Sequence, residues 1–188
     1  MKSFSNKKKI TKTWFKNLRN EICNEFLNLE KKKSKKKIQF IKKKWIKSKK
    51  KSEGGGEMAL LRDGNIFEKV GVNISEVSGK FDNKYKKQIP GAEKNPNYWA
   101  AGISLVAHFK NPKIPSLHFN TRYIVTTKEW FGGGMDVTPC IPDVKQKKYF
   151  HNELKKMCDR HNLSYYKKHK KNCDKYFYLP HRKEPRGD

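Results

Sequence analysis

Histidine, asparagine and arginine alternate along one short segment, at His118, Asn120 and Arg122. Because the side chains of a strand point alternately to its two faces, these three would share one face, opposite Phe119 and Tyr123. An imidazole, an amide and a guanidinium are more polar groups than a plain core holds, and together they suit a pocket for an anion. A hydrogen-bonded structural histidine is the alternative that stays open.

The preceding apolar segment has the same alternation. Ser104 and His108 fall on one face of a predicted strand, and a connector with two prolines follows. If that connector returns the chain antiparallel, His108 comes near His118, and Ser104 lines up with the end that holds residues 120–122. We hypothesise this pairing of two polar strand faces.

Three consecutive glycines precede a single acidic residue in "WFGGGMDVTP". Glycine allows backbone conformations and close approaches that side chains block, and Gly132, Gly133 and Gly134 would leave room for a bulky ligand. Asp136 would then accept hydrogen bonds from N–H groups of that ligand. A glycine-rich turn with a capping aspartate explains the same residues, and both interpretations stay open. No Lys-Ser/Thr follows, so a phosphate-binding loop is excluded.

Ligands for a metal are dispersed along the chain. The six histidines show no H-x-x-x-H spacing and the four cysteines no C-x-x-C pair, so the pattern itself signals a metal only weakly. His161 and His169 lie among lysines, and we interpret them as solvated helix residues. The cysteine usage and the lack of a secretory pattern favour a reducing cytosol, and the longest apolar stretch is too short for a membrane helix.

Positive charge gathers at the N-terminus. The chain has 188 residues and a formal net charge of +27, of which residues 1–52 contribute +17 from 20 basic and three acidic residues. We predict a basic N-terminal helix and lysine-rich arm over 1–52 and a catalytic domain over 53–188. The charge indicates either an anionic partner or a lysine-rich genome. No motif for specific nucleic-acid binding is present.

The elements that must position these residues can be read from periodicity. Trp14, Leu18, Ile22 and Phe26 predict a helix that ends near Glu30. Over 31–51 a solvated linker is favoured over an exposed strand. The following glycines, 54–56, predict a loop.

Strands occupy the middle of the chain in this interpretation. We predict a strand through Val72 and Ile74, a surface loop over 80–97, the two polar-faced strands, and two amphipathic helices near 150–161 and 166–176. The predicted class is α+β, with a central sheet flanked by helices.

Four blocks of sequence resemble the oxygen-dependent coproporphyrinogen III oxidases, in that family's order. They are "LRDGNIFEKVGVNIS", "AGISLVAHFKNPKIPSLHFNTRY", "WFGGGMDVTP" and "KKNCDKYFYLPHRKEPRG", and the likeness runs from about Trp14 to Gly187. The resemblance implies an antiparallel central sheet and a cytoplasmic enzyme that is a homodimer when complete. It also implies conversion of two propionates of coproporphyrinogen III to vinyl groups, giving protoporphyrinogen IX, with O2 as acceptor and without flavin, NAD or heme.

The same resemblance implies roles for individual residues. His118 would be the proton donor, and Asp136 the second catalytic residue, facing pyrrole N–H groups. Substrate contacts would come from Ser104, Asn120, Thr121, Arg122, Gly132, Gly133 and Gly134. A divalent cation would be held by His108, His118, His151 and His181.

The family continues beyond the last block, whereas this chain stops at Asp188. We therefore expect a C-terminally truncated copy, with part of the pocket missing. Two alternatives to the enzyme stay open: a basic module that binds RNA or an anionic membrane through residues 1–52, and an inactive remnant that binds tetrapyrrole.

Overall fold

The computed structural model describes residues 2–33, 37–49, 51–84 and 86–187. Its helices are α1 (Lys2–Lys33), α2 (Val144–Asp159) and α3 (Tyr165–Phe177), with short 3-10 turns at Lys51–Glu53 and Lys86–Gln88. Its strands are β1 (Ile41–Ile46), β2 (Gly54–Arg62), β3 (Phe67–Lys80), β4 (Asn97–Phe109), β5 (Ser116–Val125), β6 (Glu129–Thr138), β7 (Tyr178–Leu179) and β8 (Glu184–Pro185). The predicted α+β class with an antiparallel sheet is confirmed.

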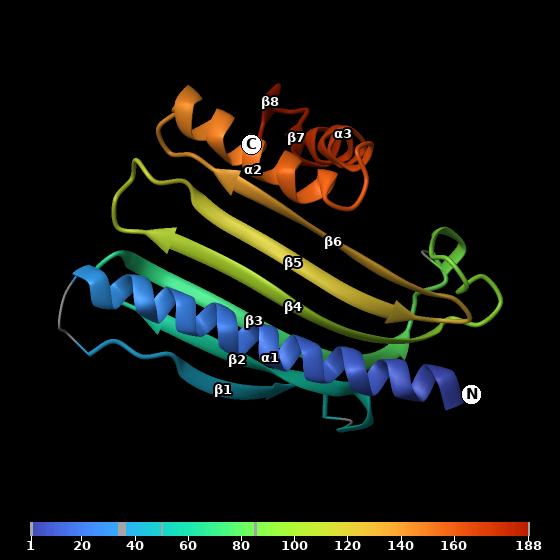
Figure 1. The fold of residues 1–188 in the computed structure, drawn as a ribbon. Helices are drawn as coiled ribbons and strands as arrows, with labels where there is room; N and C mark the ends of the chain where they lie inside the picture. The colour runs from blue at the N-terminus through green and yellow to red at the C-terminus, as the bar shows by residue number, and fades with distance from the viewer. Residues whose placement is uncertain (1, 34–36, 50, 85, 188) are drawn as a thin grey trace. The chain divides into compact units, whose positions relative to one another are not determined.

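The long strands form one sheet in chain order, β1-β2-β3-β4-β5-β6 (Figure 1). The β2–β3 and β3–β4 ladders are long and antiparallel, and Ala59 pairs with Val72, which pairs with Leu105. The chain divides into two compact units. The first unit comprises residues 1–110 and 118–135, the second 111–117 and 136–188.

Helix α1 packs on β3 and β4 and buries one face of the sheet in the first unit (Figure 1). Phe26 meets Phe67 edge to face at 4.8 Å between ring centroids, and Phe67 lies 4.8 Å from Phe109. Val70 and Val72 below them are fully buried. Burial of this apolar area drives the docking of α1.

The buried stripe of α1 includes the predicted Phe26, but N-terminal to it the stripe is turned by one residue from the predicted one. Trp14 is 49% exposed, whereas Phe15 is 2% exposed and Cys23 is buried. The helix also begins at Lys2, well before the predicted stripe. The prediction counted apolar residues only, but two buried positions of the stripe are the charged Arg19 and Glu30.

Arg19 ties α1 to strand β2. Its guanidinium is 2% exposed, donates to Glu57 at 2.7 Å and to the Asn20 side chain at 3.0 Å. The hydrogen bond from Arg19 lowers the pKa of the Glu57 carboxyl below its usual 4.5. Burial raises the pKa of the neighbouring Cys23 thiol to about 11, so this cysteine stays neutral.

Glu30 ties the end of α1 to the turn between β2 and β3. Its carboxylate is 1% exposed and accepts hydrogen bonds from the backbone N–H groups of Asn65, Ile66 and Phe67. A Cβ on Gly64 would lie 2.2 Å from a carboxylate oxygen of Glu30, so the turn needs glycine there. The carboxylate therefore fixes where α1 ends against the sheet.

Two sequence predictions on strands and loops were wrong. Residues 41–46, favoured as solvated linker, form the edge strand β1, which pairs with β2. The glycines at 54–56 begin β2 and are not a loop. Side chains at Gly55 and Gly56 would lie 2.1 and 2.2 Å from the carbonyl oxygens of Trp45 and Ile74, because the neighbouring strands approach closely.

Other elements agree with the sequence. The strand through Val72 and Ile74 is β3, and residues 81–96 connect β3 to β4. The two C-terminal helices are α2 and α3, and His161 and His169 are exposed as predicted. No helix in the described part of the chain is long and apolar enough to cross a membrane.

We expect Glu30→Ala to lower the free energy of unfolding by about 3 kcal/mol or more, because it leaves several buried backbone N–H groups without an acceptor. Urea denaturation of the two proteins measures the difference. Glu25→Ala, at an exposed position of the same helix, is the control. Equal loss in both variants would contradict the anchoring role of Glu30.

We expect Glu57→Gln to destabilise the protein by about 2 kcal/mol at neutral pH, the value of a charge-assisted hydrogen bond. Since the folded pKa of Glu57 lies below its unfolded value, the ion pair stabilises above pH 4.5 and is lost as the pH falls through the folded pKa. Unfolding free energies of wild type and variant should therefore converge in acid. A constant difference from neutral pH into acid would refute this.

Candidate functional site

The sheet of the first unit has a second face, opposite α1, which carries most of the predicted polar residues. We call it the open face, and in this unit it is defined by Gly71, Asn73, Gly102, Ser104, Val106, His108, His118, Asn120, Arg122, Gly132 and Gly134. Alternation in β3 and β4 sets this face, because Val72 and Ile103 point to the buried side. Of the middle-strand residues on this face, Gly102 is buried, whereas His108 and Arg122 are exposed.

Strands β4 and β5 align their polar residues as predicted. A Cβ on Gly102 would lie 3.0 Å from the Cβ of Arg122, so these two residues lie opposite each other. Counting along antiparallel strands sets Ser104 opposite Asn120 and Val106 opposite His118. His108 is then one diagonal step from His118, about 7 Å away by the usual sheet spacing.

The side chains of this row can bind an anion. Asn120 Nδ2 and His118 Nε2 lie 3.4 Å apart, at the limit of a hydrogen bond. In the described part of the chain, Arg122 makes no ion pair, so its planar guanidinium is available to a carboxylate. Ser104 and Asn120 are half-exposed beside it and add neutral hydrogen-bonding groups.

Thr121 does not share the open face. Alternation places it beside Tyr123, which is buried, stacks on Phe131 at 4.8 Å and donates to Glu129. Burial, and then the Glu129 carboxylate, raise the pKa of Tyr123 to about 12. This second cluster faces α1, where Lys7 pairs with Glu129. The structure therefore brings together the side chains of residues 118, 120 and 122 but leaves Thr121 on the other side of β5.

The glycine run lies inside strand β6, so the turn interpretation was wrong. A Cβ on Gly133 would lie 2.2 Å from the carbonyl oxygen of Asn120 and 2.8 Å from the Cα of Thr121. A Cβ on Gly134 would meet nothing within 4 Å, and one on Gly132 only the Trp130 ring at 3.9 Å. Gly133 is thus required by the neighbouring strand, whereas Gly132 and Gly134 leave open space above the sheet.

Asp136 belongs to the second unit and is buried, with 5% exposure. The Thr138 hydroxyl donates to it at 3.5 Å. Burial, and after it the carboxylates of Asp174 and Asp136, raise the pKa of the Cys173 thiol on helix α3. The Asp136 carboxylate is therefore held in a water-poor setting, where a charge interacts strongly with a donor.

The predicted cation ligands are divided between the units. His108 and His118 lie in the first, and His151 and His181 in the second. His151 Nδ1 and the Tyr166 hydroxyl form a hydrogen bond of 3.2 Å, and His181 is exposed. Among the described residues, no three His, Cys, Asp or Glu side chains converge as metal ligands. The cation site therefore stays a prediction from the resemblance, and we assign no step to a metal.

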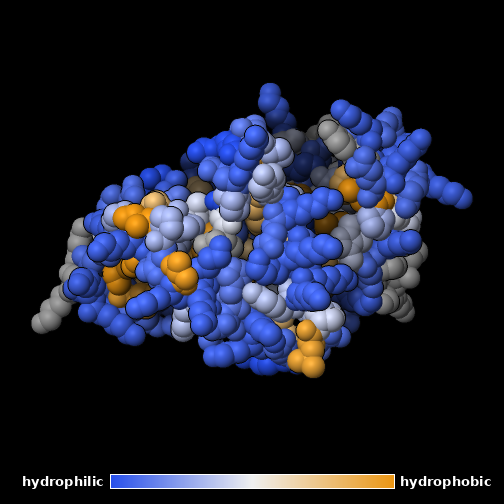
Figure 2. Space-filling view, turned by 90° about the horizontal axis from the view of Figure 1, so that it is seen from above, coloured by the Kyte–Doolittle hydropathy of each residue, from blue (hydrophilic) through white to orange (hydrophobic). Residues whose placement is uncertain are grey.

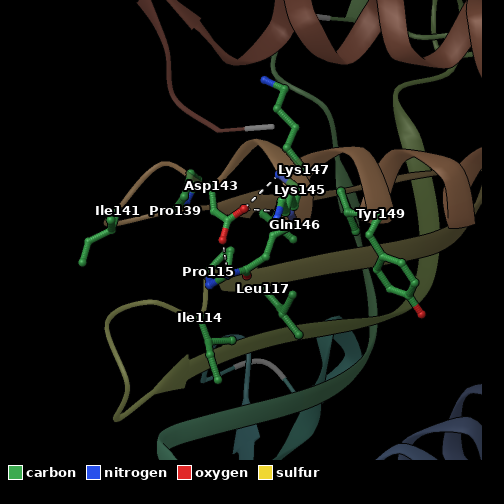
Figure 3. Close-up of a pocket in the computed structure, with 12 residues that line it drawn as sticks. Ile114, Pro115, Leu117, Pro139, Ile141, Asp143, Lys145, Gln146, Lys147 and Tyr149 are labelled. Atoms are coloured by element: carbon green, nitrogen blue, oxygen red, sulfur yellow. Dashed lines mark hydrogen bonds between the residues drawn. The ribbon is translucent and has the colours of Figure 1, made fainter.

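The second unit also has a pocket of about 520 Å³ that holds none of the predicted residues (Figure 3). Ile114, Leu117 and Ile141 line it, and Asp143 and Gln146 lie at its helical wall. Asp143 caps α2 by accepting from the N–H groups of Lys145 and Gln146 at 2.8 and 3.0 Å. These hydrogen bonds lower the pKa of Asp143, so we assign this carboxylate the role of a helix cap.

One face of the molecule is mainly hydrophilic. Figure 2 shows a predominantly hydrophilic face with apolar residues in small separate groups. Among the exposed apolar side chains are Ile41 and Ile46 of the edge strand β1, at 68% and 65% exposure. Lysines stand between them, as is common where an edge strand must not pair with another chain.

An antiparallel sheet with one helix-covered face and one polar, glycine-rich face defines an α+β protein in which a sheet face carries the candidate site. The family model for coproporphyrinogen III oxidase matches residues 10–187, so the chain belongs to that family. Oxygen-dependent coproporphyrinogen-III oxidases of Rickettsia africae, Rickettsia rickettsii and Rickettsia bellii are each 50% identical to it over 184 residues.

These matches cover 96% of this chain and 64% of each relative. The chain therefore spans slightly less than two thirds of the length of these relatives. The family resemblance that the four sequence blocks carried is confirmed.

We expect Gly133→Ala and Gly134→Ala to differ sharply in stability. The added methyl at position 133 must displace the β5 backbone, whereas the one at 134 enters open space. Gly133→Ala should lower the melting temperature by about 3 °C or more, as a loss above ~1 kcal/mol does in a chain of this size. Gly134→Ala should leave it nearly unchanged. Equal melting temperatures would contradict the assignment of Gly133 to the strand contact.

Proposed function

We propose that the protein binds coproporphyrinogen III and converts it with O2 to protoporphyrinogen IX, as a step of heme and porphyrin biosynthesis. Family membership over residues 10–187 is the observation that carries this proposal. The relatives are named oxygen-dependent coproporphyrinogen-III oxidases, and the open face supplies groups suited to their substrate.

The substrate has carboxylates at its rim and N–H donors at its centre. Arg122 would hold a propionate by a two-point contact, and Ser104 and Asn120 would add hydrogen bonds beside it. Gly132 and Gly134 would let the ring lie close to β6, since a side chain there would occupy that space. Asp136 would accept from pyrrole N–H groups. In this proposal Thr121 contributes its backbone, because its side chain belongs to the face of Tyr123.

The reaction balances with O2 as the only oxidant. Each propionate, R–CH2–CH2–COO−, loses CO2 and the equivalent of a hydride to become R–CH=CH2, and O2 takes up the two electrons as H2O2. One proton is consumed for each propionate, and His118 would be the proton donor. Removal of a pyrrole proton, helped by the Asp136 carboxylate, would make the ring electron-rich enough to react with O2. Neither flavin, NAD nor heme enters this scheme.

Three further features of the family enter as proposals only. A divalent cation on His108, His118, His151 and His181 is implied by the resemblance, as are a homodimer and a cytoplasmic location. For the cation, the described residues supply no convergent donor set. No observation favours RNA or membrane binding through residues 1–52.

We expect the purified protein to convert coproporphyrinogen III in air. The assay oxidises the products to porphyrins, separates them and measures their fluorescence. Asp136→Ala should abolish conversion, because the change removes the carboxylate proposed to accept from pyrrole N–H groups. The variant should stay folded. Asp143→Ala is the matched control: it removes the α2 cap, lowers stability and leaves conversion intact.

Unchanged conversion by Asp136→Ala would refute the role of that carboxylate. Wild-type protein that binds the tetrapyrrole without converting it would contradict the proposed activity and support the inactive remnant. Absence of both binding and conversion would contradict the proposed substrate.

A further inference from the structure

Asn73 occupies the middle of β3 on the open face, directly opposite Ser104 of β4. Since Ser104 lies opposite Asn120 of β5, three neutral hydrogen-bonding side chains form a row across three adjacent strands. The family resemblance implies substrate contacts for the second and third members of this row, but not for Asn73. The row therefore includes one residue, Asn73, beyond those predicted to contact substrate.

The side-chain oxygen of Asn73 is buried and accepts no hydrogen bond from any residue the structure describes. Native proteins fill nearly all buried acceptors, because a buried acceptor that has lost water and gained no donor is unfavourable. The backbone groups around it are already used in the β2–β3–β4 ladders. A donor from outside the described chain, either an ordered water or a bound ligand, would fill it.

The surroundings of Asn73 admit a flat ligand. Gly71, the next residue of β3 on the same face, has nothing within 4 Å of a Cβ built on it. Val106, opposite Gly71, is 41% exposed. Rotation of the terminal asparagine torsion has a broad energy profile and can turn the oxygen toward this space.

We propose that Asn73 is a substrate-contacting residue whose side-chain oxygen accepts a hydrogen bond from a pyrrole N–H of the tetrapyrrole. The inference rests on the proposed function. The side-chain oxygen of Asn73 needs a hydrogen-bond donor. The carboxylates at the ligand's rim only accept hydrogen bonds, whereas pyrrole nitrogens that carry hydrogen donate them. In this proposal Asn73 contacts the centre of the ring, and Arg122 contacts a carboxylate at its rim.

The test compares two stable ligands by fluorescence titration of the 188-residue protein. Metal-free coproporphyrin III carries N–H groups at its centre, and zinc coproporphyrin III carries none. Asn73→Ala should weaken binding of the metal-free ligand about tenfold, the effect of one hydrogen bond, and leave the affinity for the zinc complex unchanged. The ratio of the two affinities, taken within each protein, cancels general effects on the pocket.

Asn65→Ala is the matched control. Asn65 also has a buried side-chain nitrogen without a partner among the described residues, but it lies in the turn held by Glu30. This control should bind both ligands as wild type does. The melting temperature of Asn73→Ala should equal or exceed that of wild type, because the variant loses an unfilled acceptor.

Each outcome is decisive. A wild type that binds neither ligand refutes the proposed function itself. A wild type that binds both, with an Asn73→Ala variant whose affinity ratio is unchanged, refutes the role of Asn73 alone. A lower melting temperature with equal weakening for both ligands would make Asn73 a structural residue and overturn the inference.

Discussion

One-sided burial of the sheet by α1 is the constraint on which the first unit depends. Strand side chains alternate, so once Val70, Val72 and Ile103 pack under the helix, every second residue must lie on the other face. A shift of register by one residue would exchange the two faces. Arg19 and Glu30 prevent such a shift, since each buried charge has a single partner site on β2 or on the β2–β3 turn.

The open face follows from that constraint and explains why its composition is unlike a second core. Its middle strands carry small and polar residues, from Gly71 and Asn73 to Asn120 and Arg122. An apolar face of this size exposed to water would invite association, and a face of charged side chains would leave no space for a ring. Neutral hydrogen-bonding groups beside a guanidinium suit a ligand with an acidic rim and a donor centre.

Much of this could be predicted from the sequence, because alternation is a local property. The shared face of His118, Asn120 and Arg122 came from period two, and the alignment of Ser104 with the end that holds residues 120–122 came from the predicted antiparallel return of the chain. The buried charges of α1 could not be predicted, because their partners lie in β2 and in the turn after it. The glycine run at 132–134 was ambiguous for the same reason: only the position of β5 distinguishes Gly133 from Gly134. Asn73 was missed, although its place between Val72 and Ile74 already assigned it to the polar face.

The central claim is that tetrapyrrole binds on the open face, and side-chain NMR of the 188-residue protein tests it most directly. On addition of coproporphyrin III, the amide signals of Asn73 and Asn120 should shift, while that of Asn20, beside the buried Arg19 on α1, should not. Shifts confined to the Gln146 side chain at the pocket of the second unit, with Asn73 and Asn120 unmoved, would contradict the account.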